Sequence, residues 1–253
     1  MANVAPFDRF APIALRARER VFVLTGAGIS AESGIRTFRD ARGLWEDYRV
    51  EDVASPEGWA RDPVTVWRFY SQRRAQAAEC APNPAHRALG ELARALGDRL
   101  FLCTQNVDSL HERAGSSRVM HMHGELFRSR CDACDAPDFA DDRTYLSLAA
   151  IPRCRCGGTI RPHIVWFGEV PFGLREIGEE LDACDVFVTI GSSGVVYPAA
   201  GFVRHVRSRA GVRAIYVGPE APENAEAFDE CRLGKASEVV PGLFASSGFK
   251  GPS

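Results

Sequence analysis

The chain has 253 residues, enough for one large domain or for one domain with a small satellite. Its hydrophobic content of 45% and charged content of 25% are those of an ordinary globular protein, and the net charge of -2 argues against nucleic acid as a stable partner. No apolar run is long enough to span a bilayer, and the first twenty residues lack the features of a secretion signal. We therefore expect a cytoplasmic protein without membrane attachment, whose cysteines are reduced.

Apolar runs of strand length alternate with helix-like stretches along the chain. The expected strands cover residues 21–24, 100–103, 119–122, 164–167, 186–190 and 214–217, and the clearest helices cover 84–96 and 174–182. This alternation is typical of a parallel sheet with helices on both faces. Two stretches break the pattern: about 41–81, which reads as helical without a clear strand, and about 127–160, which holds four of the eight cysteines. We interpret both as insertions into one open α/β domain.

The first expected strand is followed by the glycine-rich run GAGISAESGIRTFRD, residues 26–40. Gly26, Gly28 and Gly34 allow the backbone to turn tightly and to approach a ligand closely. Such a turn alone is a weak sign of nucleotide binding. Here it is followed in order by TQNVD (residues 104–108), HMHGEL (residues 121–126) and a CxxC pair. This ordered set resembles the sirtuins, the NAD-dependent protein lysine deacylases.

The resemblance covers nearly the whole chain and implies a single sirtuin catalytic domain over residues 1–253. It implies an α/β fold in which a Rossmann-like, doubly wound parallel sheet binds NAD, with that domain made of residues 11–40, 82–126 and 161–248. A small domain is expected from two inserts, a helical one at 41–81 and a zinc-binding one at 127–160. Without the resemblance, the pattern of hydrophobic residues predicts only an α/β protein with a cysteine-rich insert.

Two cysteine pairs in the second insert have the spacing of metal ligands. They are Cys131 and Cys134, then Cys154 and Cys156, with nineteen residues between the pairs. Four thiolates leave no position open for water, so one structural zinc ion is expected. The second pair is CxC where sirtuins more often have CxxC, and a narrower turn makes Cys154 the weakest of the four predictions. The other cysteines are expected to be buried apolar residues.

The residues also limit the chemistry of the site. We find neither an open catalytic metal site nor a serine nucleophile motif, whereas NAD offers a good leaving group in its nicotinamide–ribose bond. The resemblance assigns the catalytic base to His123 in HMHGEL, and histidine suits that role because its ordinary pKa lies near neutrality. Asn106 is the second expected catalytic residue, and His121 is expected to be structural.

The resemblance further implies a set of cofactor contacts from several loops. Phe38 and Arg39 would shield and order the reactive end of NAD, and Gly218 stands where sirtuins usually carry an asparagine beside the adenosine ribose. The expected cofactor-binding residues are Gly26, Ala27, Gly28, Ser30, Ala31, Phe38, Arg39, Trp45, Gln105, Asn106, Val107, Asp108, Gly191, Ser192, Ser193, Gly218, Pro219, Glu220 and Ala236.

The run FYSQRR places Tyr70 and Arg73 on one face of the expected helix. A buried arginine beside a phenol can grip a carboxylate at the end of an acyl chain. With Ala31, this arrangement resembles the sirtuin branch that removes succinyl, malonyl and glutaryl groups, whose bacterial members also deacetylate. The alternative is that Arg73, like Arg74, is a solvated helix residue. The peptide is expected to pair by backbone with the segment that contains Val165, Trp166, Phe167 and Gly168.

The leading hypothesis is a protein lysine deacylase that removes acetyl and succinyl or malonyl groups and releases nicotinamide and O-acyl-ADP-ribose. Its partners would be proteins that carry acylated lysine, and we expect a monomer. Mono-ADP-ribosyl transfer to proteins is the alternative that uses the same NAD site. A zinc-ribbon protein that binds nucleic acid or a partner, and an inactive NAD sensor, fit the motif set and the net charge less well.

Overall fold

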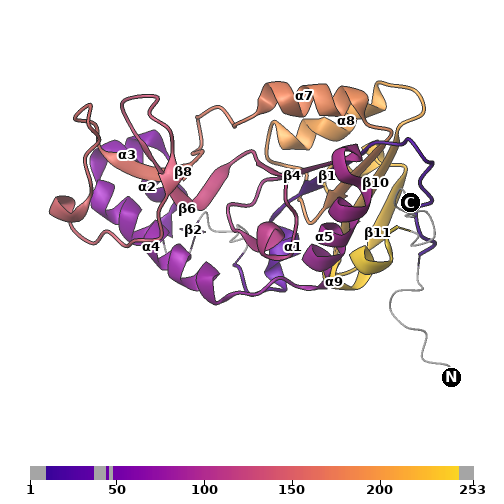
Figure 1. Ribbon diagram of the computed structural model, residues 1–253, viewed down its shortest axis with the longest axis horizontal. Coiled ribbons are helices and arrows are strands. Elements are labelled where there is room, and N and C mark those ends of the chain that lie inside the picture. The colour runs from indigo at the N-terminus through magenta and orange to yellow at the C-terminus, as the bar shows by residue number, and fades with distance from the viewer. Residues whose placement is uncertain (1–9, 37–43, 46–47, 245–253) are drawn as a thin grey trace.

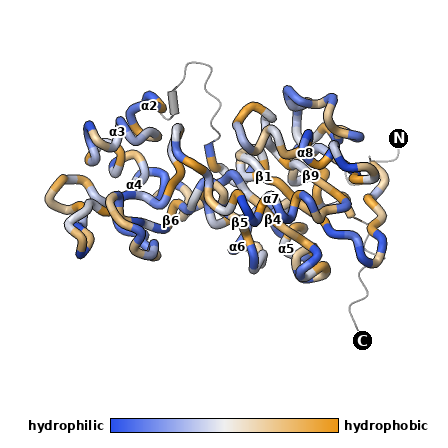
Figure 2. The backbone as a smooth tube through the Cα atoms, turned by 90° about the horizontal axis from the view of Figure 1, so that it is seen from above, coloured by the Kyte–Doolittle hydropathy of each residue, from blue (hydrophilic) through white to orange (hydrophobic). Residues whose placement is uncertain are grey.

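The computed structural model describes residues 10–36, 44–45 and 48–244. The chain forms two lobes, which are separate in both views (Figures 1 and 2). The larger lobe contains a six-stranded parallel sheet in the order β11-β10-β9-β1-β4-β5. Its strands are β1 (Val21–Thr25), β4 (Leu100–Thr104), β5 (Val119–His121), β9 (Val186–Ile190), β10 (Arg213–Gly218) and β11 (Glu230–Leu233).

Helices cover both faces of this sheet because successive side chains of each strand point to opposite faces. In β1, Val21 and Val23 pack with Leu89 of α5 (Pro84–Leu96), whereas Phe22 packs with Leu181 of α7 (Leu174–Ala183). Helix α8 (Phe202–Arg207) lies beside α7, and α9 (Ala236–Val239) lies beside α5 (Figure 1). The expected α/β class with a doubly wound parallel sheet is thereby confirmed.

The strand order changes direction at β1, which has β9 on one side and β4 on the other. Thr25, the last residue of β1, stands in register with both Thr104 and Ile190. The loops after these three strands therefore meet at one edge of the sheet. In open α/β sheets, ligands bind at the carboxyl edge where the order reverses.

The smaller lobe joins the two predicted insertions around one aromatic core. Its helices are α2 (Val50–Val53), α3 (Pro56–Arg61) and α4 (Pro63–Glu79), and an antiparallel sheet is formed by β6 (Gly124–Cys131), β7 (Phe139–Ala140) and β8 (Ile160–Ile164). Trp59, Trp67, Phe69, Tyr70 and Trp166 are buried in this core. Four further short elements are α1 (Ala27–Ala31), α6 (Leu110–Arg113), β2 (Leu44–Trp45) and β3 (Tyr48–Arg49), and short 3-10 helices lie in several of the connections.

The expected strand at 164–167 is wrong. Strand β8 ends at Ile164, and residues 166–169 form a turn in which the Trp166 N–H donates to Glu169 Oε2 at 2.8 Å. Gly168 adopts φ of +89° there, which an extended strand does not allow. The first insertion, expected to lack strands, contains the short antiparallel pair of β2 and β3.

No helix in the described part of the chain is both long enough and apolar enough to cross a membrane.

Candidate functional site

Two glycine-rich loops pack directly against each other at the carboxyl edge of the sheet. The Gly26 N–H donates to Ile190 O and the Gly28 N–H donates to Gly191 O, both at 2.9 Å. A Cβ atom added to Gly28 would lie 2.7 Å from Gly191 Cα. Gly191 has φ of +66°, in the left-handed region that favours glycine. The predicted glycines are therefore required for this contact, and Ala27 lies half-buried between the first two.

Asn106, which follows β4, is held against the first of these loops. Its side-chain amide donates to Gly26 O at 3.2 Å and to Ser30 Oγ at 3.0 Å, and its backbone N–H donates to Thr104 Oγ1 at 3.0 Å. The residue is only 8% exposed. The structure thus brings together three of the predicted site residues, Asn106, Gly26 and Ser30.

Gln105, which follows β4, forms hydrogen bonds with the end of β1 and with the loop after β9. Its backbone N–H donates to Thr25 O at 2.9 Å, and its side-chain amide donates to Ser192 Oγ at 3.1 Å. Ser193 accepts a backbone hydrogen bond from Glu223 at 3.1 Å on the far side of the same loop. The predicted residues of the β4 and β9 loops therefore face one another across the end of β1.

His123 lies between β5 and β6, half-buried at the same edge. Its Nδ1 is 3.1 Å from Gln105 O. A carbonyl oxygen only accepts, so Nδ1 carries the proton, and Nε2 of the neutral ring keeps its lone pair. Burial lowers the pKa of His123 below its ordinary value, against the opposing hydrogen bond to Gln105. The geometry and the lowered pKa suit a general base.

His121 is fixed in a different way. Its Nδ1 lies 3.0 Å from Asn106 O and its Nε2 lies 2.8 Å from Glu112 Oε1. Burial disfavours the charged ring, but the hydrogen bond and negative charge of Glu112 outweigh it and raise the pKa of His121. Both ring nitrogens are thus engaged within the protein, as expected for a structural histidine.

Asp108 is buried at the start of α6, where its Oδ1 accepts the Leu110 N–H at 3.1 Å. Burial raises the pKa of Asp108, although hydrogen bonds from Leu110 and Ser30 oppose the rise. This bond closes a tight turn just ahead of α6, whose first residue is Leu110. Val107, beside it, accepts the Leu126 N–H at 2.8 Å and so connects the loop to β6.

A buried polar layer below the loops was not predicted from the sequence. The hydroxyls of Thr25 and Thr104 are 2.7 Å apart, and His111 Nε2 lies 3.0 Å from Thr25 Oγ1. His86 accepts the Asn83 N–H at Nδ1, so its Nε2–H faces Ser30 Oγ at 3.4 Å. Burial lowers the pKa of His86 to about 4, so this histidine is neutral at physiological pH.

Asn83 holds the end of the first loop. Its side-chain oxygen caps α5, and its amide donates to Ile29 O at 2.7 Å and to Ser33 Oγ at 3.0 Å. The sequence contained one signal for this residue, the Asn-Pro pair that typically begins a helix. Nothing in the local sequence indicated that the same side chain also reaches residues 29–33.

The four cysteines of the second insert lie together, with all sulfur atoms within 4.8 Å of one another. Cys131 and Cys156 are 3.5 Å apart at sulfur, and Cys134 and Cys154 are 3.8 Å apart. Zn–S bonds of about 2.3 Å in a tetrahedral site place sulfur atoms about 3.8 Å from each other. The set fits one zinc ion, and Cys154 of the narrow CxC pair lies within the cluster.

Tyr70 and Arg73 lie together on α4, and both are buried. Tyr70 Oη accepts the Trp166 Nε1–H at 3.0 Å, and burial raises the pKa of Tyr70 to about 12, which keeps the phenol neutral. The Arg73 guanidinium lies over the Phe69 ring, and the residue is only 6% exposed. Arg73 is therefore not a solvated helix residue.

The segment expected to pair with a peptide, residues 165–168, begins beside His123. The Val165 N–H donates to His123 O at 2.9 Å, and the Phe167 N–H donates to Ala54 O at 3.0 Å. Phe167 is 52% exposed and Gly168 is exposed, whereas Trp166 is buried against Tyr70. Two of these residues, Phe167 and Gly168, are thus accessible from solvent, while Trp166 belongs to the core of the smaller lobe.

The remaining predicted cofactor residues lie at the edges of the site or outside the description. Gly218 is buried at the end of β10, and Tyr216 Oη occupies the space that a side chain would need there. Ala236 is buried at the start of α9, while Ala31, Pro219 and Glu220 are exposed. Phe38 and Arg39 lie outside the described residues, as does the side chain of Trp45.

Comparison with known proteins agrees with this geometry. Residues 26–198 match the Sir2 family. The chain is 54% identical over 227 residues to an NAD-dependent protein deacylase of Yersinia pseudotuberculosis, covering 87% of this chain and 80% of that protein. It is 50% identical over 237 residues to one of Escherichia coli K12, covering 92% and 84%. A solved complex of a Sir2 homolog with NAD matches with a TM-score of 0.80 and 41% identity, covering 89% and 88%. The chain therefore belongs to the Sir2 family.

Proposed function

We propose that this protein removes acyl groups from lysine side chains of proteins and uses NAD as its co-substrate. Family membership and relatives that are named NAD-dependent protein deacylases support the proposal. The observation that carries it is the geometry of His123, whose Nδ1 is bound to Gln105 O at 3.1 Å beside the loops after β1 and β9. A neutral histidine is thus placed where those loops could bind a dinucleotide.

When bound, NAD supplies an activated nicotinamide–ribose bond, so that nicotinamide and O-acyl-ADP-ribose are released. The protein provides a backbone surface for the phosphates at Gly26, Gly28 and Gly191, where side chains are excluded. Asn106 and Gln105, whose amides are held by Ser30 and Ser192, would contact the ribose end. His123 would accept a proton from a ribose hydroxyl at Nε2, since its Nδ1–H donates to Gln105 O.

We also propose one structural zinc ion at Cys131, Cys134, Cys154 and Cys156. The close set of sulfur atoms supports it, and four thiolates leave no place for a reacting water. We propose the division of the chain that the sequence suggested: an NAD domain of residues 11–40, 82–126 and 161–248, a helical insert at 41–81 and a zinc-binding insert at 127–160. The six-stranded sheet and the lobe of α2 to α4 with β6 to β8 support this division, although β6 begins at Gly124 and the core of that lobe reaches Trp166, a few residues beyond the proposed bounds.

For the acyl group, we propose that both acetyl and the acidic succinyl and malonyl groups are accepted. The buried Tyr70 and Arg73 on one face of α4 support this proposal. A carboxylate at the end of the acyl chain would receive charge-assisted hydrogen bonds from Arg73. The peptide would lie along residues 165–168, where backbone pairing accepts many sequences.

Replacement of Arg73 by methionine tests the acyl preference. We expect kcat/KM for a succinyl-lysine peptide to fall roughly 10- to 100-fold, because a hydrogen bond to a charged group is worth about 1.5–3 kcal/mol. The value for the acetyl-lysine version of the same peptide is expected to change little, since acetyl carries no carboxylate. Arg68→Met, on the exposed face of the same helix, is the matched control. Equal losses for both peptides would contradict a carboxylate contact.

A further inference from the structure

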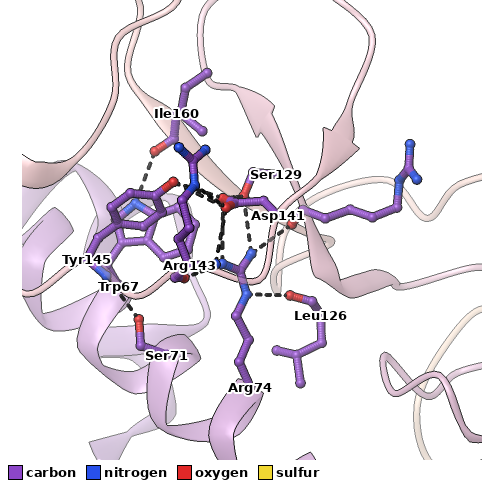
Figure 3. A network of polar contacts seen from close by, with 10 residues as sticks. Trp67, Ser71, Arg74, Leu126, Ser129, Asp141, Arg143, Tyr145 and Ile160 are labelled. Atoms are coloured by element: carbon purple, nitrogen blue, oxygen red, sulfur yellow. Dashed lines mark hydrogen bonds and ion pairs between the residues drawn. The ribbon is translucent and has the colours of Figure 1, made fainter. Parts of the chain in front are cut away.

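Helix α4 has a second buried arginine, Arg74, which follows Arg73 and is even less exposed. Arg74 is 2% exposed, and its guanidinium lies over the ring of Trp67. It donates from Nε to Leu126 O at 2.7 Å, from Nη1 to Arg143 O at 2.7 Å, and from Nη2 to Arg128 O at 3.2 Å. Figure 3 shows these bonds running from one side chain of α4 to β6 and to the segment that follows it.

Asp141 balances the charge of Arg74 within the same network (Figure 3). Its side chain is fully buried, with Oδ2 at 3.5 Å from Arg74 Nη1. Ser129 Oγ donates to it at 2.6 Å and Arg143 Nε donates to it at 2.9 Å. Burial favours the protonated acid, but these hydrogen bonds and the charge of Arg74 hold the pKa of Asp141 below its ordinary value. The buried pair is therefore ionised and fully engaged.

Leu126 connects this network to the catalytic edge. Its carbonyl accepts from Arg74, while its N–H donates to Val107 O at 2.8 Å. Val107 lies in the β4 loop beside Gln105, whose carbonyl holds His123. Hydrogen bonds thus connect α4 to His123 through Arg74, the backbone of Leu126 and the loop after β4.

We propose that Arg74 is a positioning residue that fixes Tyr70 and Arg73 relative to His123 and so sets the acyl-chain preference. The inference rests on the acyl preference proposed above. A planar guanidinium that bonds three carbonyls holds the helix in one orientation and at one distance. A lysine keeps the charge but offers a single flexible point of attachment, so α4 could shift along β6.

The test is a kinetic comparison of Arg74→Lys with the wild type, on acetyl-lysine and succinyl-lysine versions of one peptide. We expect KM for the succinyl peptide to rise about tenfold, while KM for the acetyl peptide stays within about twofold. In an Arg73→Met background, Arg74→Lys is expected to have no further effect on the succinyl peptide, because it acts through Arg73. Arg232→Lys, at a buried arginine of β11 away from α4, is the control.

Zinc content and thermal unfolding report whether each variant is folded. Should Arg74→Lys fail to fold, Asp141→Asn decides. It keeps the size of the side chain but removes the negative charge that holds the Arg74 guanidinium in place, so it is expected to show the same selective rise in KM. Equal losses for both peptides, or no loss in a folded variant, would overturn the inference while Arg73→Met still supports the acyl proposal. A wild type that removes acetyl but never succinyl would overturn both, because no carboxylate contact would exist to be positioned.

Discussion

Replacement of His123 by alanine is expected to lower kcat for deacylation by a factor of roughly 10²–10⁴, the usual contribution of a positioned general base. The loss should leave NAD binding nearly unchanged, because the glycine loops and Asn106 are held by contacts that do not involve this ring. Steady-state kinetics and NAD titration of the same sample measure the two effects. His205→Ala removes an exposed histidine bonded to Asp182 and serves as the control.

The pH dependence of the wild type is a second readout of the same role. The base must be neutral, and burial lowers the pKa of His123 below its ordinary value of about 6.5. Activity should therefore be full at neutral pH and fall as the pH drops through a value below 6.5. This acid limb should be absent from the residual activity of His123→Ala. An acid limb centred above 6.5, or one retained in the variant, would argue against His123 as the base.

Loss of the metal is expected to have the largest effect on stability. Cys131→Ser removes a buried sulfur at the end of β6, and we expect loss of zinc and unfolding of the smaller lobe. Structural zinc ions contribute about 10–16 kcal/mol in small zinc-binding peptides, comparable with the total stability of a domain, about 5–15 kcal/mol. Elemental analysis and thermal unfolding measure the result.

The control for this change is Cys231→Ser, which alters a cysteine of β11 outside the cluster. It should retain one zinc ion per chain and unfold near the wild-type temperature. Cys131→Ser could instead unfold at the wild-type temperature after complete loss of metal. The aromatic core alone would then stabilise the smaller lobe, and the prediction of a structural zinc ion would be wrong.

The parallel sheet could be predicted because its strands are buried on both faces. Such strands read as continuous apolar runs, and β9 (Val186–Ile190) and β1 were found within one residue of their true ends. Helix α5 was predicted at its observed bounds because Asn83 and Pro84 mark its start and Gly97 follows its end. Local signals of this kind need no knowledge of the rest of the fold.

The structure of the smaller lobe was harder to predict because it depends on contacts between segments that are distant in the sequence. Strand β6 carries Arg128 and Arg130 and so lacks the apolar run of a central strand. The segment after Ile164 is apolar but turns, because the Glu169 carboxylate accepts the Trp166 N–H. Arg74 is buried by carbonyls more than fifty residues away along the chain, which no local pattern indicates.

For the site, the sequence motifs identified residues that the fold does bring together. Asn106 contacts the first glycine loop, and His123 lies at the carbonyl of Gln105. The supporting layer was missed, since Thr25 and His86 are isolated polar residues in apolar or helical stretches. Their partners come from other elements, so their roles become visible only once the sheet has assembled.

The central claim is tested most directly by the masses of one peptide carrying acetyl-lysine or succinyl-lysine, incubated with the purified protein with and without NAD. We predict that both peptides lose the acyl group only when NAD is present, with one nicotinamide released for each lysine freed. Acyl groups that stay in place, or a gain of ADP-ribose mass on a protein in their stead, would contradict the assignment of this protein as a lysine deacylase.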